Sequence, residues 1–276
     1  MNYLQFDFEV IPGEKTEALI AVLGNFNFEG FEETDVCLKA FIAEDKLGSE
    51  SIAAITELFP DVLYKKSIIE NINWNKQWED NFHPVIVEDF VGIRAHFHPV
   101  ITNVQHEIII TPKMSFGTGH HATTHMMIEL MQAINFKDKK VMDFGTGTGV
   151  LAILAEKMGA TKVLAIDNDE WSIENSKENF GKNNCTAITL SFNNLIKATH
   201  NFDVILANIN LNIILNNLGS IAAAVNKSAH IVLSGFLKQD ENAIKNALKA
   251  NHLDYKNTLQ RGEWIAITAE NTNITP

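Results

Sequence analysis

A glycine-rich run at residues 143–149, with the sequence DFGTGTG, carries the clearest chemical signal in this chain. It follows the apolar pair Val141 and Met142 and leads into the apolar segment VLAILA, so the pattern predicts a strand, a tight turn and the start of a helix. Glycine has no Cβ and adopts positive φ at little cost, so alternating glycines let a backbone approach a bound ligand closely. We interpret the run as a binding site for a nucleotide-like cofactor.

The glycines alone leave the identity of the cofactor open. Residues 147–152 also fit the G-x-G-x-x-G/A pattern of NAD and FAD sites. Asp143, two positions before Gly145, places a carboxylate beside the turn, which suits the ammonium and sulfonium of S-adenosylmethionine better than a pyrophosphate. Asp167 ends the apolar strand VLAI and can accept both ribose hydroxyls of either cofactor. We therefore favour S-adenosylmethionine over NAD, with a purely structural tight turn as a further interpretation.

Asn208 and a second glycine loop could complete the same site. In an open α/β sheet the ligand lies beyond the carboxyl ends of the strands, and Asn208 follows the predicted strand at 202–207. Its side-chain carbonyl can accept a hydrogen bond from an amine while its amide donates elsewhere. Alternatively, an asparagine here caps the helix that starts near Leu211. The loop at 116–124, FGTGHHATT, opens another helix, and its donors and hydroxyls could close over the cofactor.

The sequence indicates no metal site. His121 and His125 have helical i, i+4 spacing, but HATTH lacks the glutamate of the H-E-x-x-H zinc motif, and no third ligand is indicated. Cys37 and Cys185 lie far apart in different predicted elements, so neither a disulfide nor a cysteine metal site is expected.

Composition is that of an ordinary globular protein with an acidic N-terminal region. The 276 residues are 46% hydrophobic and 20% charged, enough for one large or two modest domains. No apolar run approaches the roughly 18 residues of a membrane span and the N-terminus lacks signal-peptide features, so we expect a cytoplasmic protein. Residues 1–70 hold 14 Asp and Glu against 5 Lys and Arg, a balance of −9 within the total of −12. Such a region repels phosphate backbones and attracts basic partners, unless it serves only as a solubilising surface.

The predicted elements divide the chain into three parts. Residues 1–70 read as β-α-β-β-α-β, the order of a ferredoxin-like α+β domain. Residues 71–83 carry Trp74 and Trp78 at helical spacing and predict a helical linker. Residues 84–276 begin with short strands and continue as repeated β-α units, which predict a doubly wound, mostly parallel Rossmann-like domain.

Several motifs together resemble those of the bacterial ribosomal protein L11 methyltransferases, over about residues 71–268. The FGTGH loop in front of a methyltransferase glycine motif is much more specific than the glycine motif alone. The N-terminal region agrees with that family only in its predicted topology. The matching segments are NW at 73–74 with Trp78, FGTGH at 116–120 with Thr123 and Thr124, DFGTGTG at 143–149, DND at 167–169, ANI at 207–209 and GEW at 262–264.

The resemblance implies transfer of methyl groups from S-adenosylmethionine to lysine side chains and the N-terminal amine of ribosomal protein L11. It also implies that the small N-terminal domain recognises this basic protein, and family precedent favours a monomer. Three positions depart from the family pattern: Lys113 replaces glycine, Glu170 replaces proline and Asn210 replaces a small apolar residue. By motif position, the residues that would contact the cofactor are Thr124, Gly145, Asp167 and Asn208, with Phe116, Gly117 and Gly147 in the surrounding loops and Asp143 beside the turn.

The expected mechanism needs little acid–base chemistry, and other functions remain open. No Asp, Glu or His in the motifs is an obvious base, so we expect Asn208 to orient the amine and the proton to leave to solvent. Alternatives are a methyltransferase of the same fold acting on RNA or another substrate, an NAD-dependent oxidoreductase, and a catalytically silent binding module. The negative charge and the lack of a basic or aromatic platform count against direct binding of nucleic acid.

Overall fold

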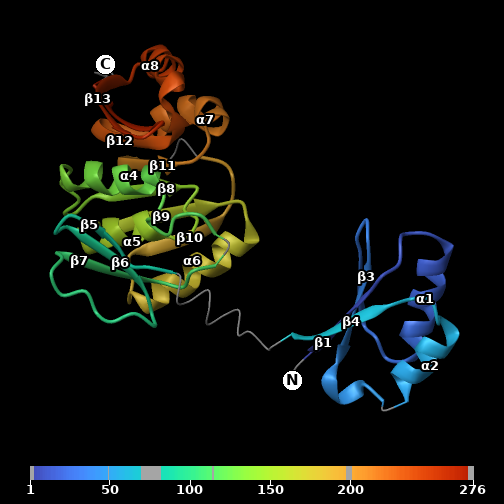
Figure 1. Cartoon of the computed structure of the whole chain (residues 1–276). Coiled ribbons are helices and arrows are strands. Elements are labelled where there is room, and N and C mark those ends of the chain that lie inside the picture. Colours follow the sequence, from blue (N-terminus) through green and yellow to red (C-terminus); the bar gives the residue numbers. More distant parts are fainter. Residues whose placement is uncertain (1–2, 49, 70–81, 114, 197–200, 273–276) are drawn as a thin grey trace. The chain divides into compact units, whose positions relative to one another are not determined.

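The computed structural model of the chain describes residues 3–48, 50–69, 82–113, 115–196 and 201–272. The chain divides into two compact units, Met1–Asn81 and Phe82–Pro276 (Figure 1). The predicted linker helix at 71–83 falls on residues outside the described ranges, apart from Phe82 and His83. Within those ranges, no helix combines the length and the apolar character needed to span a membrane.

The N-terminal unit is a four-stranded antiparallel sheet with two helices. Its elements are β1 (Tyr3–Phe8), α1 (Glu14–Asn25), β2 (Gly30–Glu33), β3 (Leu38–Ala43), α2 (Ser51–Leu58) and β4 (Tyr64–Ile69). The strand order is β2-β3-β1-β4. Leu4, Phe6 and Phe8 alternate along β1 and share one apolar core with Leu19 and Leu23 of α1, so the period-2 pattern of the strand selects the covered face. These features confirm the predicted ferredoxin-like α+β fold.

The C-terminal unit contains a three-stranded sheet and a seven-stranded sheet. The small sheet consists of β5 (Val85–Val87), β6 (Val91–Ala95) and β7 (His106–Ile110), with β7 at an edge. The order of the large sheet is β10-β9-β8-β11-β12-β14-β13. The first five strands in this order are parallel to one another, and β14 is antiparallel to both of its neighbours. Its strands are β8 (Lys140–Phe144), β9 (Lys162–Asp167), β10 (Ile188–Phe192), β11 (Phe202–Asn208), β12 (Val225–Leu237), β13 (Asp254–Arg261) and β14 (Trp264–Glu270).

Helices cover both faces of the large sheet. They are α4 (Ala122–Gln132), α5 (Val150–Lys157), α6 (Glu170–Lys182), α7 (Leu211–Ala224) and α8 (Glu241–Ala250). Two neighbouring residues of β8 face opposite sides of the sheet. Val141 belongs to an apolar core with Ile153 of α5, whereas Met142 belongs to a second core with Leu218 of α7 and Leu248 of α8. A strand buried on both faces reads as a continuous apolar run, as residues 204–207 do. The doubly wound, mostly parallel fold predicted for this region is confirmed.

A row of asparagines on α6 and at its C-cap pairs with the backbone of the edge strand β7 and of the residue that follows it. Asn183 donates through Nδ2 to the Ile109 carbonyl oxygen at 2.6 Å and accepts from the Ile109 N–H at 3.0 Å. Asn179 accepts from the Thr111 N–H at 2.7 Å, and Asn175 donates to the Thr111 carbonyl oxygen at 3.0 Å. The backbone groups at this edge therefore find partners on a helix instead of on another strand.

The C-terminal part of the sheet differs most from the sequence-based expectation. The sequence pattern predicts neither α8 nor β13, and it assigns only residues 230–233 to β12, which runs over Val225–Leu237. Strand β13, DYKNTLQR, lies at the edge of the sheet and is largely exposed, so it lacks the apolar alternation that marks a half-buried strand. In β12, Ser228 has a φ of +58°, and the polar segment around it interrupts the apolar pattern.

Candidate active site

The glycine turn is held between neighbouring loops by close backbone packing. The N–H groups of Gly145 and Thr146 both donate to the Ile166 carbonyl oxygen of β9 at 2.9 Å. A Cβ on Gly145 would lie 2.2 Å from Cγ2 of Ile209, and a Cβ on Gly147 would lie 2.3 Å from the Phe116 carbonyl oxygen. Both glycines also have positive φ, +78° and +55°. The space that these glycines leave is thus occupied by other loops of the protein, which bring residues from β9, β11 and the FGTGH loop to one place.

The FGTGH loop is fastened to the glycine turn through Thr148. The Thr148 N–H donates to the Phe116 carbonyl oxygen at 2.9 Å, and its hydroxyl donates to the Gly117 carbonyl oxygen at 2.7 Å. The Thr148 carbonyl oxygen accepts from Nδ2 of Asn179, in the asparagine row of α6, at 2.8 Å. Gly117 therefore anchors its loop from behind, while the Phe116 side chain, 52% exposed, lines a cavity.

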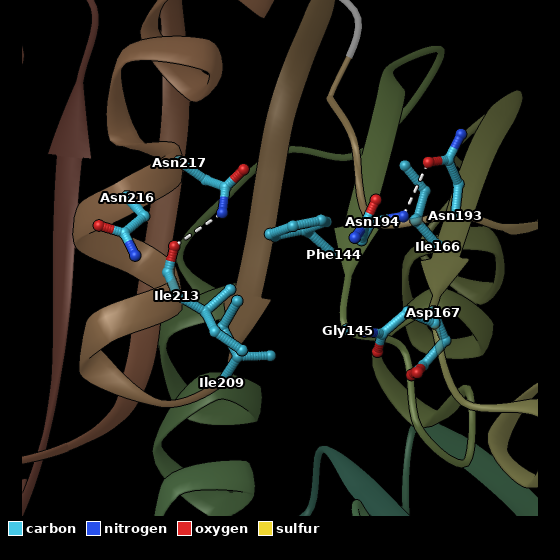
Figure 2. Close-up of a pocket in the computed structure, with 11 residues that line it drawn as sticks. Phe144, Gly145, Ile166, Asp167, Asn193, Asn194, Ile209, Ile213, Asn216 and Asn217 are labelled. Carbon is cyan, nitrogen blue, oxygen red and sulfur yellow. Dashed lines mark hydrogen bonds between the residues drawn. The ribbon is translucent and has the colours of Figure 1, made fainter.

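Two adjoining cavities open at the carboxyl ends of the parallel strands. The first measures about 270 Å³; Figure 2 shows Ile209 and Ile213 on one side of it and Gly145 and Asp167 on the other. The second measures about 380 Å³ and shares those four residues and Asn168 with the first. The first is also lined by Phe144, Ile166, Asn193, Asn194, Asn216 and Asn217, and the second by Phe116, His121, Thr123, Gly147, Ser172, Asn208, Asn210, Gly235 and Trp264.

Asp167 is fixed where the two cavities meet. Its Oδ2 accepts from the Gly147 N–H at 2.8 Å, and its Oδ1 accepts from the Asp169 N–H at 3.1 Å. A carboxylate offers about four lone-pair sites, so two backbone donors orient the group and leave acceptor capacity for a ligand. This geometry agrees with the role that the sequence predicts for Asp167, a ligand for vicinal hydroxyls.

Asn208 presents a buried carbonyl that has no partner. It is the last residue of β11 and is 9% exposed. Its Nδ2 donates to Oγ1 of Thr124, a completely buried residue of α4, at 3.2 Å, while its Oδ1 is buried without a hydrogen-bond partner among the described residues. An unsatisfied buried acceptor costs about 1–3 kcal/mol, which a donor on a ligand would recover. The helix-cap role belongs to its neighbour Asn210, whose Oδ1 accepts from the Ile213 N–H at 3.1 Å.

Asp143 lies behind the glycine turn and lines neither cavity. It is 1% exposed, its Oδ2 accepts from the Thr146 hydroxyl at 2.6 Å, and its Oδ1 has no hydrogen-bonding side chain or backbone partner within the described ranges. Burial raises the pKa of this carboxyl to about 7, against the lowering effects of the Thr146 hydroxyl and the Ala152 backbone N–H. The structure thus brings Gly145, Gly147, Asp167, Asn208 and Phe116 to the cavity walls, whereas Asp143, Gly117 and Thr124 support those walls from behind.

Three aromatic rings stand around the second cavity. The His121 ring centroid lies 5.3 Å from that of Phe116 and 4.7 Å from that of Trp264, both at steep interplanar angles. Nδ1 of His121 accepts from the Thr123 N–H at 3.3 Å and caps α4. His125 instead contacts Arg261 and Glu129. In the described ranges no three His, Cys, Asp or Glu side chains are grouped as a metal site requires.

Some cavity residues were not predicted from the sequence. Gly235 has a φ of +99°, and a Cβ on it would lie 2.2 Å from the Ile209 carbonyl oxygen. It follows the predicted strand at 230–233, so the rule that ligands lie beyond strand ends would have indicated it. Asn216 and Asn217 lie inside α7, where nothing in the pattern distinguishes them from other polar helix residues. Of the departures from the family pattern, Asn210 caps α7 and Lys113 forms an ion pair with Glu178 at 2.8 Å.

Comparison with known proteins identifies the family. The family model described as ribosomal protein L11 methyltransferase (PrmA) matches residues 16–272. The protein named ribosomal protein L11 methyltransferase from Porphyromonas gingivalis is 37% identical over 97% of both chains, and its namesake from Chlorobaculum tepidum is 36% identical over 99% of this chain and 98% of the relative. The crystal structure of ribosomal protein L11 methylase from Lactobacillus delbrueckii subsp. bulgaricus matches with a TM-score of 0.65 and 27% identity, covering 70% of this chain and all of that one. The chain belongs to the ribosomal protein L11 methyltransferase family.

Proposed function

We propose that this protein transfers methyl groups from S-adenosylmethionine to lysine side chains and the N-terminal amine of ribosomal protein L11. The observation that carries the proposal is the Asn208 carbonyl, which is buried and partnerless at the carboxyl end of β11. It is an acceptor without a donor in a cavity with aromatic walls, and an amine supplies such a donor. Membership of the family supports the protein substrate, and a ribosomal substrate supports the cytoplasmic location that the proposal includes.

The residues at the two cavities fit S-adenosylmethionine. Apolar side chains beside the amides of Asn193 and Asn194 in the first cavity suit a flat, polar-edged base. Asp167 suits the ribose hydroxyls, and the second cavity, next to Gly145, is assigned to the methionine part. The buried carboxyl of Asp143 behind the turn favours a cationic ligand over a pyrophosphate. When bound, the cofactor supplies a methyl group activated by a sulfonium.

Asn208 orients the amine that receives the methyl group. Its amide is held by Thr124, so the carbonyl cannot rotate away without losing that hydrogen bond. Accepting one N–H of a neutral amine points the nitrogen lone pair in a defined direction, which is the main requirement of an in-line displacement. Phe116 and Trp264 contribute ring surface that excludes water and favours an alkylammonium or alkylamine stem.

The amine must lose a proton before it can attack. A free lysine has a pKa of about 10.4, so a neutral amine at pH 7 costs about 4 to 5 kcal/mol unless its surroundings lower that pKa. Among the described residues of the second cavity, the ionisable side chains are Asp167 and His121. Asp167 accepts from two backbone N–H groups and its remaining acceptor capacity is assigned to the ribose hydroxyls. Nδ1 of His121 accepts from Thr123, which leaves the neutral ring with its proton on Nε2. We therefore assign the proton to solvent, with an apolar surrounding that lowers the amine pKa.

The N-terminal unit supplies the recognition surface in this proposal. Glu29 and Glu32 form ion pairs with Lys46 and Lys39, so half of the acidic cluster at Glu29, Glu32, Glu33 and Asp35 is already neutralised. Glu33 and Asp35 are exposed and take part in none of the ion pairs formed by the described residues. These two carboxylates are the stronger candidates to attract a basic protein.

Mass spectrometry of ribosomal protein L11 after incubation with the enzyme and cofactor tests the function. We expect mass increments of whole methyl groups on lysines and on the N-terminal amine, and none without cofactor. Equilibrium binding should show S-adenosylhomocysteine bound and NAD not bound. Label transfer to ribosomal RNA in place of the protein, or no transfer to any ribosomal component, would refute the proposal.

A further inference from the structure

The β13–β14 hairpin carries Trp264 to the second cavity and is attached to α4 at two points. Trp264 is the first residue of β14 and is the cross-strand partner of Arg261, the last residue of β13. The Trp264 ring contacts His121, and Nη1 of Arg261 lies 2.8 Å from Nδ1 of His125. His121 and His125 are four residues apart and therefore lie on the same face of the helix. Through them, one face of α4 contacts both β13 and β14 next to the turn that joins these strands.

The Nδ1 atom of His125 faces two groups with opposite requirements. Arg261 lies 2.8 Å from it and can only donate, whereas Oε1 of Glu129 lies 3.2 Å from it and can only accept while ionised. In the neutral ring with a bare Nδ1, His125 accepts from Arg261. After protonation Nδ1 donates to Glu129, and the contact with Arg261 becomes a repulsion between two cations.

The surroundings of His125 favour its neutral form. Burial lowers the pKa of His125, and the Arg261 guanidinium lowers it further, while Glu129 and Glu88 act in the opposite direction with a smaller effect. The charged groups that face this ring thus come from α4 itself, from the hairpin and from the turn before β6. The attachment between Arg261 and His125 therefore persists at neutral pH and is lost as the medium becomes acidic.

We propose that His125 and Arg261 are positioning residues that hold the Trp264 indole at the amine pocket while the His125 ring is neutral. The inference rests on the proposed function, because the pocket concerned is the one assigned to the substrate amine. Neither residue lines the cavities, so both act through the hairpin. Arg261 takes part in none of the ion pairs found in the described parts of the chain, and its side chain is attached through the hydrogen bond to His125.

Steady-state kinetics on ribosomal protein L11 test the proposal first. At about pH 8, Arg261→Ala should raise KM about fivefold, as expected for one exposed charge-assisted hydrogen bond, with a smaller change in kcat and unchanged affinity for S-adenosylhomocysteine. Arg261→Lys, which keeps a donor without the fork of the guanidinium, should recover part of the loss. His125→Gln keeps an acceptor that does not titrate. It should therefore lack the additional KM increase that the unmodified enzyme shows at about pH 5.5, while ionisation of the substrate affects both proteins equally.

A measurement without substrate separates this proposal from the proposed function. The full chain has four tryptophans, so labelling with 5-fluorotryptophan gives four fluorine resonances. The resonance that is missing from Trp264→Phe belongs to Trp264. That resonance should shift on acidification in the unmodified protein and not in His125→Gln, and in Arg261→Ala at about pH 8 it should take its acidic position. Equal titration in the unmodified protein and His125→Gln, or an unchanged KM in Arg261→Ala, would overturn the proposal. An enzyme that methylates no ribosomal protein L11 would refute the function, while the resonance would still decide the role of the pair.

Discussion

Replacing Asp143 by asparagine tests whether the buried carboxyl behind the glycine turn lowers the stability of the ligand-free protein. Burial raises the pKa of Asp143 from 3.8 to about 7. The folded chain therefore binds more protons than the unfolded chain between about pH 4 and pH 7. Stability should fall as the pH rises through this window and level off above it.

The size of the effect follows from the pKa shift. A shift of about three units corresponds to about 4 kcal/mol at 1.36 kcal/mol per unit, and about 3 kcal/mol of this falls between pH 5 and pH 8. Asparagine keeps an acceptor for the Thr146 hydroxyl and carries no charge. The free energy of unfolding of Asp143→Asn minus that of the unmodified protein should thus increase by about 3 kcal/mol from pH 5 to pH 8.

Urea denaturation of the full chain at both pH values measures this difference. Asp203→Asn is a matched control, because burial would raise the pKa of Asp203 but hydrogen bonds from the Lys140 N–H and Asn226, together with the charges of Lys139 and Lys140, outweigh it and lower that pKa. Asp203 therefore stabilises the fold above its unfolded pKa and loses this effect only in acid below about pH 4, so Asp203→Asn should show the same stability difference at pH 5 and pH 8. A stability difference for Asp143→Asn that is the same at pH 5 and pH 8 would refute the reasoning.

The same ionisation should be visible when the cofactor binds. A cationic ligand near the turn favours the carboxylate form of Asp143, so binding of S-adenosylmethionine at pH 7 should release up to about half a proton. Calorimetry in buffers with different ionisation enthalpies measures this release. Asp143→Asn should release less, and so should S-adenosylhomocysteine with the unmodified enzyme, since it lacks the sulfonium charge. Equal release by both ligands would show that Asp143 does not respond to the cofactor charge.

Three further substitutions test other parts of the site. Asn208→Ala should lower kcat on ribosomal protein L11 about 100-fold with unchanged affinity for S-adenosylhomocysteine, and methylation at full rate would exclude the orienting role. Gly145→Ala places a methyl group against Ile209 and should destabilise the chain by about 1–3 kcal/mol in thermal denaturation, part of which the added change Ile209→Ala should restore. Glu33→Gln combined with Asp35→Asn should raise KM several-fold at low salt and little at high salt, and an unchanged KM at low salt would argue against acidic docking.

Local sequence patterns predict the site wherever the chain turns sharply after an apolar strand. The turn at Gly145, the carboxylate of Asp167 and the position of Asn208 all follow from the rule that ligands lie beyond strand ends. The choice between Asn208 and Asn210 could not be made in this way, because a cap and a substrate ligand use the same side chain two residues apart. Only the paired contacts to Thr124 and to the Ile213 N–H separate them.

Contacts between distant segments could not be predicted. Nothing in the sequence indicates that the space left by Gly145 is filled by Ile209, or that Arg261 reaches His125 across 136 positions. The pattern also gives no indication of β13, because an edge strand with polar residues on both faces lacks the alternation on which such a prediction depends. These features arise from packing between elements, which local propensity does not encode.

The asparagine row of α6 connects the small sheet to the glycine turn at residues 143–149, called the cofactor loop below. Four residues of helix advance about 6.0 Å and two residues of strand about 6.6 Å, so Asn183 and Asn179 stay in step with Ile109 and Thr111. Asn179 at the same time holds the Thr148 carbonyl of the glycine turn. Inserting a single residue in α6 would turn the row away, leave an open strand edge able to recruit other chains, and release the cofactor loop together with it. Asn179 therefore links the pairing of this strand edge to the placement of the cofactor loop.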